Sequence, residues 1–215
     1  MKNKPWENHY KYNKSELSYP DENLVRLLSK YLNNFSDEFS SLNAVDLGCG
    51  SGRHLKLFHD LGIKNIIGTD NSFNALKISG KPGTYDLIHC DNKNIPLKNN
   101  SIDIVAAWGS LHYDYKDELP KMIEEILRIL KTGGGLFATL RSDNDTYLKR
   151  GTLIGNNVWQ TDLGDLEGSI ASFYTDDEVQ SYFSKFNDFS LGHMSRSIIG
   201  DKDKIISHWI IKAGK

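Results

Sequence analysis

Along the chain, segments with apolar residues at helical spacing alternate with short continuous apolar runs. Between residues 21 and 35 they recur every three or four residues, which predicts an amphipathic helix with Asp21 as a candidate cap at its start. Further on, apolar runs predict strands near residues 44–47, 65–70, 85–90, 102–107 and 136–140. Helical spacing separates several of these runs, most clearly at about 53–61 and 115–130. This alternation favours a doubly wound α/β sheet with parallel strands.

The pattern changes after Leu140. Residues 142–174 are rich in glycine, asparagine and aspartate and contain only isolated aromatic residues, which predicts a long functional loop that we place over the substrate. Thr175 and Glu178 then have the spacing of a capping box, which predicts that a helix starts there. Two later runs predict strands close enough in sequence to pair antiparallel, at residues 189–194 and 205–211.

Composition narrows the class of protein. The 215 residues are 39% hydrophobic and 25% charged, which is ordinary for a soluble globular protein. No apolar run approaches the roughly 18 to 20 residues of a membrane helix, and the first six residues lack the apolar core of a signal peptide. We therefore expect a cytoplasmic protein without a membrane partner.

Charge and cysteine content exclude two further kinds of site. The formal charge of −2 offers no basic face for a nucleic acid. We interpret the lysines of the first fourteen residues (Lys2, Lys4, Lys11, Lys14) as part of a solvated flexible arm, with a local basic patch as the alternative. Cys49 and Cys90 have no neighbouring cysteine or histidine at a zinc-binding spacing. We expect no nucleic-acid partner and no metal.

Residues 45–54, VDLGCGSGRH, carry the clearest chemical signal. Glycines 48, 50 and 52 follow a predicted strand and open a helix, so that the backbone can approach a ligand at the helix N-terminus. Arg53 stands where a dinucleotide-binding G-x-G-x-x-G turn needs its third glycine, which disfavours a nicotinamide cofactor. The Gly-Lys-Ser/Thr that closes a P-loop is also missing from this turn.

This segment resembles motif I of the class I S-adenosylmethionine-dependent methyltransferases, and the resemblance extends over residues 43–140. Asp70 ends the second predicted strand, Asp91 and Asn92 follow the third, and residues 127–135 (LRILKTGGG) resemble the family's later helix-turn-strand signature. The resemblance implies a Rossmann-like, doubly wound sheet of seven strands, mostly parallel with an antiparallel last strand, and with helices on both faces.

The resemblance also implies S-adenosyl-L-methionine as cofactor and S-adenosyl-L-homocysteine as product. Asp70 would then accept hydrogen bonds from the ribose hydroxyls, and Asp91 would meet the adenine amine. Asp46 would either fasten the glycine loop through backbone amides or face the cofactor's amino group, and Arg53 would reach the methionine carboxylate or lie in solvent. The full set of expected cofactor-binding residues is Tyr19, Asp46, Gly48, Cys49, Gly50, Gly52, Arg53, Asp70, Asn71, Ser72, Asp91, Asn92 and Trp108.

Candidates for catalysis and acceptor binding follow the fourth predicted strand or lie outside the core. His112, in WGSLHY, has an intrinsic pKa suited to a general base, and a structural or helix-capping histidine is the alternative. An aromatic leader either folds over the cofactor's sulfonium or covers the sheet, and comprises Trp6, Tyr10, Tyr12 and Tyr19. Candidate walls of the acceptor pocket are Arg141, Trp159, Phe173, Tyr174 and His193, with core packing favoured for Phe173.

We expect a single methyltransferase domain with an N-terminal lid and helix (1–42), a cofactor-binding core (43–140), and a substrate-lid insertion with C-terminal strands (141–215). Residues 106–109, AAWG, depart from the Asn/Asp-Pro-Pro-aromatic motif of the family's N-methylating branch, which disfavours nucleobase or glutamine acceptors. The expected reaction is methyl transfer to an oxygen or nitrogen of a small polar metabolite, such as a sugar or surface-polysaccharide precursor. Alternatives are a protein or RNA methyltransferase, a nicotinamide-dependent oxidoreductase and a non-catalytic cofactor-binding partner; the pattern leaves the oligomeric state open.

Overall fold

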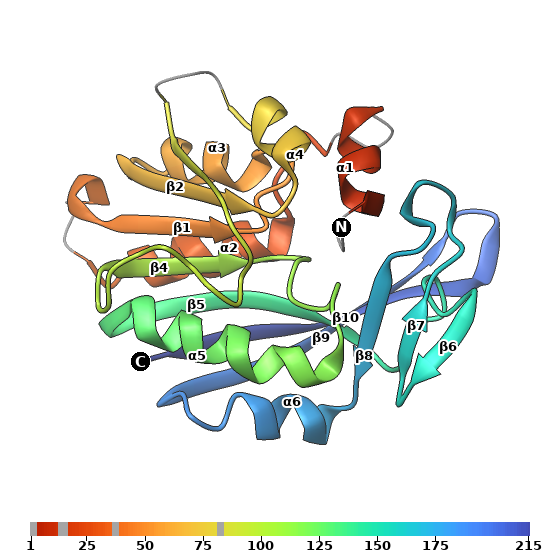
Figure 1. The fold of residues 1–215 in the computed structure, drawn as a ribbon. Helices are drawn as coiled ribbons and strands as arrows, with labels where there is room; N and C mark the ends of the chain where they lie inside the picture. The colour runs from red at the N-terminus through yellow and green to blue at the C-terminus, as the bar shows by residue number, and fades with distance from the viewer. Residues whose placement is uncertain (1–3, 13–16, 36–38, 81–83) are drawn as a thin grey trace.

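Five parallel strands form the centre of the molecule in the computed structural model, which describes residues 4–12, 17–35, 39–80 and 84–215 (Figure 1). Their order across the sheet is β3-β2-β1-β4-β5, with every pair parallel. The strands are β1 (Asn43–Leu47), β2 (Asn65–Asp70), β3 (Asp86–His89), β4 (Ile102–Ala107) and β5 (Leu130–Ser142). The order reverses at β1 and β4, and open α/β sheets bind ligands beyond the carboxyl ends of such strands.

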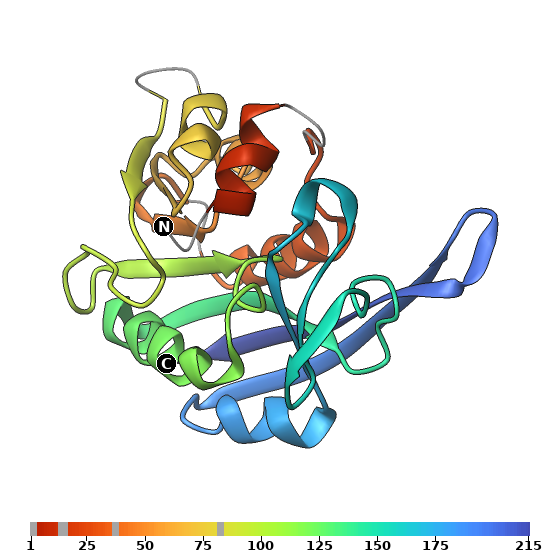
Figure 2. The ribbon, with the colours of Figure 1, turned by 45° about the vertical axis from the view of Figure 1, so that its right-hand side comes forward.

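Two long C-terminal strands extend this sheet. β10 (Asp201–Gly214) pairs antiparallel with β5, and β9 (Asp188–Ile198) pairs antiparallel with β10. β9 therefore runs in the same direction as the five central strands, and the last strand of the chain is the antiparallel one, as expected. The far end of this hairpin projects from the body of the protein (Figure 2).

The segment predicted as a long loop instead adds three strands, so the sheet has ten strands rather than seven. β8 (Ile170–Tyr174) pairs parallel with the last two residues of β5, on the edge that β4 leaves uncovered. β7 (Val158–Gln160) and β6 (Thr152–Gly155) follow by antiparallel pairing, with the short 3₁₀ helix η3 (Gly164–Leu166) between β7 and β8. The loop prediction was wrong because glycine, asparagine and aspartate form the turns of this small sheet. Its strands are too short to give a clear hydrophobic pattern in the sequence between these turns.

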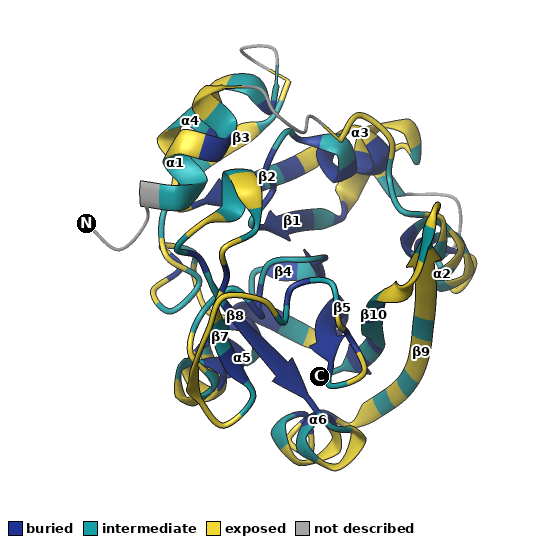
Figure 3. Cartoon of the chain, turned by 90° about the vertical axis from the view of Figure 1, so that its right-hand side faces the viewer, coloured by how far each residue is buried: buried dark blue, intermediate teal, exposed yellow. Residues whose placement is uncertain are grey.

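Helices cover both faces of the sheet, as a doubly wound fold requires. On one face, apolar side chains of α2 (Glu22–Leu32) and α3 (Arg53–Asp60) pack on β1, β4 and β5. On the other face, α5 (Leu119–Ile129) and α6 (Asp176–Tyr182) pack on the alternate residues of the same strands. Figure 3 shows the buried central strands enclosed by helices with exposed outer faces. The remaining short elements are α4 (Phe73–Ile78), η1 (Phe39–Ser41) and η2 (Lys116–Glu118).

Helix boundaries follow the capping chemistry of the sequence. Asp21 accepts a hydrogen bond from the amide of Asn23 and starts α2, and Thr175 and Glu178 form the expected capping box at α6. The helix expected from Tyr115 begins later, at Leu119, because Pro120 is compatible only with the first turn of a helix. None of the helices in the described part of the chain is long and apolar enough to cross a membrane.

The N-terminal segment is a helix, α1 (Lys4–Lys11), so the prediction of a solvated arm was wrong for these residues. Lys2 and Lys14 lie outside the described residues. The Glu7 carboxylate accepts hydrogen bonds from the backbone amides of Phe73 and Asn74 at the start of α4, at 2.7 and 3.2 Å. On the opposite side of α1, His9 Nδ1 lies 2.7 Å from a carboxylate oxygen of Asp165 in η3. These two distant contacts fix α1 above the carboxyl ends of the central strands.

Candidate functional site

The glycine bend after β1 lies directly beneath α1. A Cβ on Gly50 would come within 2.5 Å of the Tyr10 hydroxyl, so α1 packs against bare backbone at this point. Gly52 has a φ of +85°, and a Cβ there would lie 1.9 Å from the carbonyl oxygen of Ser79. Glycine is therefore required at residue 52 for the close packing of α3 on the end of α4, and at residue 50 it lets Tyr10 of α1 approach the backbone.

The Asp70 carboxylate holds this bend in place. It accepts hydrogen bonds from the amide of Gly50 at 2.9 Å and from the amide of Ser72 at 2.8 Å. Burial raises the pKa of Asp70 to about 6, although both amide hydrogen bonds favour the charged form. A carboxylate has about four lone-pair positions, so Asp70 can still accept hydrogen bonds from a ligand.

Asp46, which was also a candidate for fastening the bend, does not do so. Its side chain is 1% exposed, and neither carboxylate oxygen has a hydrogen-bond partner among the described residues. The ring of His54 lies beside this carboxylate, with Nδ1 3.5 Å from Oδ2 of Asp46. A buried carboxylate without hydrogen bonds is costly, and an amino group of a ligand would supply what this one lacks.

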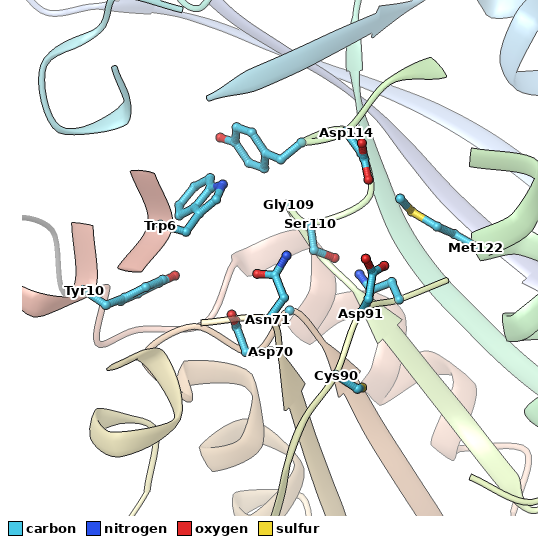
Figure 4. A pocket seen from close by; sticks show the side chains of 13 residues that line it. Trp6, Tyr10, Asp70, Asn71, Cys90, Asp91, Gly109, Ser110, Asp114 and Met122 are labelled. Carbon is cyan, nitrogen blue, oxygen red and sulfur yellow. The ribbon is translucent and has the colours of Figure 1, made fainter. Parts of the chain in front are cut away.

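Carboxylate and amide side chains from the ends of β2 and β3 gather in a pocket that we call the acidic compartment (Figure 4). It contains Asp70, Asn71, Asp91 and Asn92, all four of which were expected at the cofactor. Trp6 and Tyr10 project into it from α1 (Figure 4). Its other lining residues are Gly48, Cys90, Gly109, Ser110, Tyr113, Asp114 and Met122.

A second pocket, the basic compartment, adjoins the first. The two share five lining residues, namely Trp6, Tyr10, Gly48, Gly109 and Tyr113. Of the residues expected at the cofactor or in catalysis, it is lined by Gly48, Cys49, Gly50, Arg53, Trp108 and His112. Arg141, Arg196 and His208 also line it and come from β5, β9 and β10. One elongated ligand can therefore pass under α1 from the acidic into the basic compartment.

His112 is completely buried in the basic compartment, and neither ring nitrogen makes a hydrogen bond of good geometry to a described residue. Burial, together with the charge of Arg141, lowers the pKa of His112 well below its ordinary value, although the Thr139 backbone favours the charged form. The imidazole is therefore neutral at physiological pH and can accept or donate one hydrogen bond, but this environment disfavours the imidazolium. No capping bond of the His112 side chain occurs among the described residues, so its role as a base stays a prediction.

Four of the expected cofactor residues line neither compartment: Tyr19, Asp46, Gly52 and Ser72. The Tyr19 side chain is 84% exposed, and its carbonyl oxygen accepts a hydrogen bond from Arg53 at 3.3 Å. Ser72 is the buried N-cap of α4, where its hydroxyl accepts from the amide of Ala75. These four residues are therefore part of the glycine bend or of the segments next to it, and they do not line either compartment.

Of the residues expected to form walls of the acceptor pocket, only Arg141 lines the basic compartment. Phe173 and Tyr174 are buried in the apolar core, and Trp159 packs against the cluster around Phe173. His193 lies on the opposite face of the β9–β10 hairpin, where its Nε2 is 2.8 Å from the Ser207 hydroxyl. Sequence reasoning missed Met194, Arg196 and His208, whose only signal was their presence in strands with alternating apolar residues.

Residues 45–138 match the family described as "Methyltransferase domain". Malonyl-[acyl-carrier protein] O-methyltransferase of Buchnera aphidicola subsp. Baizongia pistaciae is 26% identical over 125 residues, which are 57% of this chain and 49% of that protein. tRNA (carboxymethyluridine(34)-5-O)-methyltransferase of Saccharomyces cerevisiae is 29% identical over 92 residues, which are 42% of this chain and 32% of that protein. The chain thus matches about half or less of the length of these curated relatives.

Solved structures show the same fold over almost the whole chain. A SAM-dependent methyltransferase from Anabaena variabilis superposes with a TM-score of 0.67 and 16% identity, covering 99% of this chain and 92% of the other. One from Methanosarcina mazei gives a TM-score of 0.66 and 18% identity, covering 88% and 96%.

Proposed function

We propose that this chain is a class I S-adenosylmethionine-dependent methyltransferase and that it transfers a methyl group from S-adenosylmethionine to an oxygen or nitrogen of a small polar metabolite. The observation that carries the proposal is the pair of adjoining compartments at the carboxyl ends of the parallel strands. One supplies carboxylates and amides for an adenosyl group, and the other supplies space and polar groups for an acceptor.

The residues of the site fit this cofactor. Asp70 has lone pairs left for ribose hydroxyls, and Asp91 stands in the same compartment for the adenine amine. Arg53 lines the basic compartment and suits the cofactor's carboxylate. Asp46 has carboxylate oxygens without a hydrogen-bond partner among the described residues but lines neither compartment, so its contact with the cofactor's amino group stays a prediction. Gly48 and Gly50 line the basic compartment, where Gly50 lies against the Tyr10 hydroxyl.

The cofactor, when bound, supplies a methyl group already activated by the positive sulfur, so this chain mainly has to align the acceptor and exclude water. Trp6, Tyr10 and Tyr113 stand where the two compartments meet and present aromatic faces. Such faces favour a cation and keep solvent out. We propose that neutral His112 orients the acceptor's nucleophilic atom through one hydrogen bond. Its role as a base for a hydroxyl acceptor stays a prediction, because burial and Arg141 disfavour the imidazolium that proton transfer would form.

The covered position of the basic compartment supports a small acceptor. α1 lies over the site and is tied to α4 through Glu7 and to η3 through the contact of His9 with Asp165. Leu166 of η3 also lines the compartment. A polymer would have to displace this cover, whereas a metabolite fits beneath it. The O-methyltransferase and tRNA methyltransferase among the relatives keep a macromolecular acceptor as the alternative to be tested.

Calorimetry and a labelling assay test the proposal together. We expect the protein to bind S-adenosylmethionine and to show no binding of NAD. With tritiated methyl donor and a cell extract, we expect label in the small-molecule fraction. Label confined to protein or RNA would contradict the small acceptor, and tight binding without any labelling would indicate a non-catalytic partner protein. Binding of NAD in place of S-adenosylmethionine would overturn the assignment altogether.

A further inference from the structure

One wall of the basic compartment is built from three neighbouring strands. The register pairs Arg141 of β5 with His208 of β10, and His208 with Met194 of β9. Ile206 and Arg196 form the next pair along the same hairpin. Since paired residues of a sheet point to the same face, all five side chains lie on one surface, which faces the start of α2.

Arg141 is buried in this wall with one donor unused. Arg141 is 7% exposed, and its Nη1 donates a hydrogen bond to Oδ2 of Asp145 at 2.5 Å. Nε of Arg141 has no hydrogen-bond partner among the described residues. The oxygens of Asp145 accept from Arg141 Nη1 and from the amides of Leu148 and Ser207, at 3.0 and 2.9 Å for the two amides, and none of these contacts involves Nε. A buried guanidinium with a free donor is a built position for a ligand oxygen.

Arg196 adds a second cation to the same compartment. Its side chain is exposed and forms no ion pair with any described residue. His208 lies between the two arginines in the wall; burial, with Arg141 and Arg196 contributing, lowers the pKa of His208 to about 3. Its Nδ1 has no partner in the described part of the chain. The wall thus presents two guanidinium ions and a neutral imidazole with an unused nitrogen.

The two acidic residues that line this compartment, Asp21 and Glu22, interact with groups outside the wall. Asp21 caps α2 through the amide of Asn23 at 2.9 Å, and Glu22 pairs with Arg26 at 2.5 Å. Arg53 stands beside the glycine bend and is assigned to the cofactor under the proposed function. Asp145 is the counter-charge of Arg141, so among the described residues the uncompensated positive charge of the wall formed by β5, β9 and β10 is that of Arg196, at the acceptor end of the site.

We propose that the acceptor carries an anionic group, a carboxylate or a phosphate, which binds between Arg141 and Arg196 while another atom of the acceptor is methylated. Guanidinium groups present planar arrays of donors that match both kinds of anion. A cationic amine would be repelled by the same pair. This inference rests on the proposed function, because it assigns a substrate class to the site that the cofactor completes.

Anion binding to the complex with S-adenosylhomocysteine tests the wall directly, because the bound product fills the position of the methionine carboxylate. Malonate and inorganic phosphate are titrated separately at constant ionic strength, and the shift of the thermal midpoint is measured. We expect saturable stabilisation of the wild type by at least one of the two anions, which distinguishes carboxylate from phosphate. Arg196→Gln should weaken this binding at least about tenfold, since it removes one of the two charges.

Lys202→Gln is the matched control, because Lys202 is an exposed cation on the same hairpin that does not line the compartment. It should leave anion binding unchanged. Equal loss in both variants would show a general charge effect, and no stabilisation of the wild type would show that the wall does not bind anions. Either result overturns the inference while S-adenosylhomocysteine binding still upholds the proposed function. Failure to bind S-adenosylhomocysteine would remove both.

The acceptor itself gives an independent measurement. A small-molecule extract is separated on an anion exchanger before the tritiated-methyl assay. We expect acceptor activity in the fraction eluted by salt, and we expect Arg196→Gln to lower the labelling rate with that fraction about tenfold at unchanged affinity for the methyl donor. Acceptor activity confined to the unbound fraction would overturn the inference.

Discussion

The two compartments are held in place by different kinds of interaction. In the acidic compartment, contacts to the backbone dominate, since the Asp70 carboxylate that lines it accepts hydrogen bonds from the amides of Gly50 and Ser72. In the basic compartment, side chains on paired strands dominate, with Arg141, His208 and Met194 in one row and Asp145 bracing Arg141 from behind. A backbone-built site is encoded in a short stretch of sequence, whereas a side-chain-built site depends on strand register.

The largest expected effect concerns the side-chain-built half. Asp145→Asn keeps the shape of a fully buried residue but leaves the buried Arg141 without its counter-charge. Breaking a buried ion pair costs about 3 to 5 kcal/mol, so we expect a loss of that size in the free energy of unfolding measured with urea. Affinity of the remaining folded protein for S-adenosylmethionine should stay unchanged, because Asp145 does not line the acidic compartment.

Asp162→Asn is the control for this variant. Arg150 and Asp162 form an ion pair at 2.8 Å in the same insertion, but both side chains are about half exposed. Such surface pairs contribute about 0 to 1 kcal/mol. If Asp145→Asn cost no more than Asp162→Asn, the bracing of Arg141 would not be what holds the basic compartment.

Gly52→Ala tests the backbone-built half. The residue has a left-handed φ, and an added Cβ would collide with the carbonyl of Ser79, which belongs to the backbone and cannot rotate away. Left-handed strain and overpacking together should lower the free energy of unfolding by about 2 to 4 kcal/mol. Gly133→Ala is the matched control, since Gly133 has a φ of +81° with no atom within 4 Å of the new Cβ. It should cost only about 1 kcal/mol, and equal costs would refute the close packing of α3 on α4.

Asp70 links the backbone-built half to pH. Ribose hydroxyls need an ionised acceptor, and burial raises the pKa of Asp70 to about 6 in the folded chain. The affinity for S-adenosylmethionine should therefore fall about tenfold between pH 7 and pH 5. Asp70→Asn should weaken binding by about 1 to 3 kcal/mol at pH 7 and remove the pH dependence, as measured by calorimetry. A wild type with constant affinity over this range would show that Asp70 only holds the bend.

The stability of the unliganded protein should depend on pH in the opposite direction to the cofactor affinity, which gives a separate check on Asp70. The pKa in the folded chain is raised above the ordinary value of 3.8, so the native state binds this proton more tightly than the unfolded chain. The resulting stabilisation is complete below about pH 4 and is lost as the pH rises through about 6. Without ligand, the wild type should lose stability relative to Asp70→Asn over this interval.

The contrast between the two halves also explains how far the sequence could predict the molecule. Strands β1 to β5, the glycine bend and the carboxylates at residues 70 and 91 were predicted, because each depends on local spacing. Which carboxylate would fasten the bend could not be predicted, because Asp46 and Asp70 both adjoin it and only the packing brings Asp70 to the amide of Gly50.

Elements fixed by distant contacts were missed. α1 lacks a strong local signal, and it is held by Glu7 at the start of α4 and by His9 beside Asp165. β8 was read as part of a loop, although it pairs with the end of β5 where β4 has stopped. Arg196 and His208 reach the site only through the register of the β9–β10 hairpin. Single-sequence patterns carry no information on such pairings until the register is known.

The smallest effect tests whether a locally encoded element in the C-terminal half behaves independently of the site. Thr175→Ala removes the side-chain acceptor of the α6 capping box, while the backbone amide of residue 175 still donates to Glu178. We expect a loss of about 1 kcal/mol in the free energy of unfolding with unchanged affinity for S-adenosylmethionine. Ser181→Ala, at an exposed position of the same helix, should change stability by less than about 0.5 kcal/mol. A change in cofactor affinity for Thr175→Ala alone would mean that α6 transmits strain to the basic compartment through β8, because Tyr174 precedes the cap and pairs with Ser142 at the end of β5.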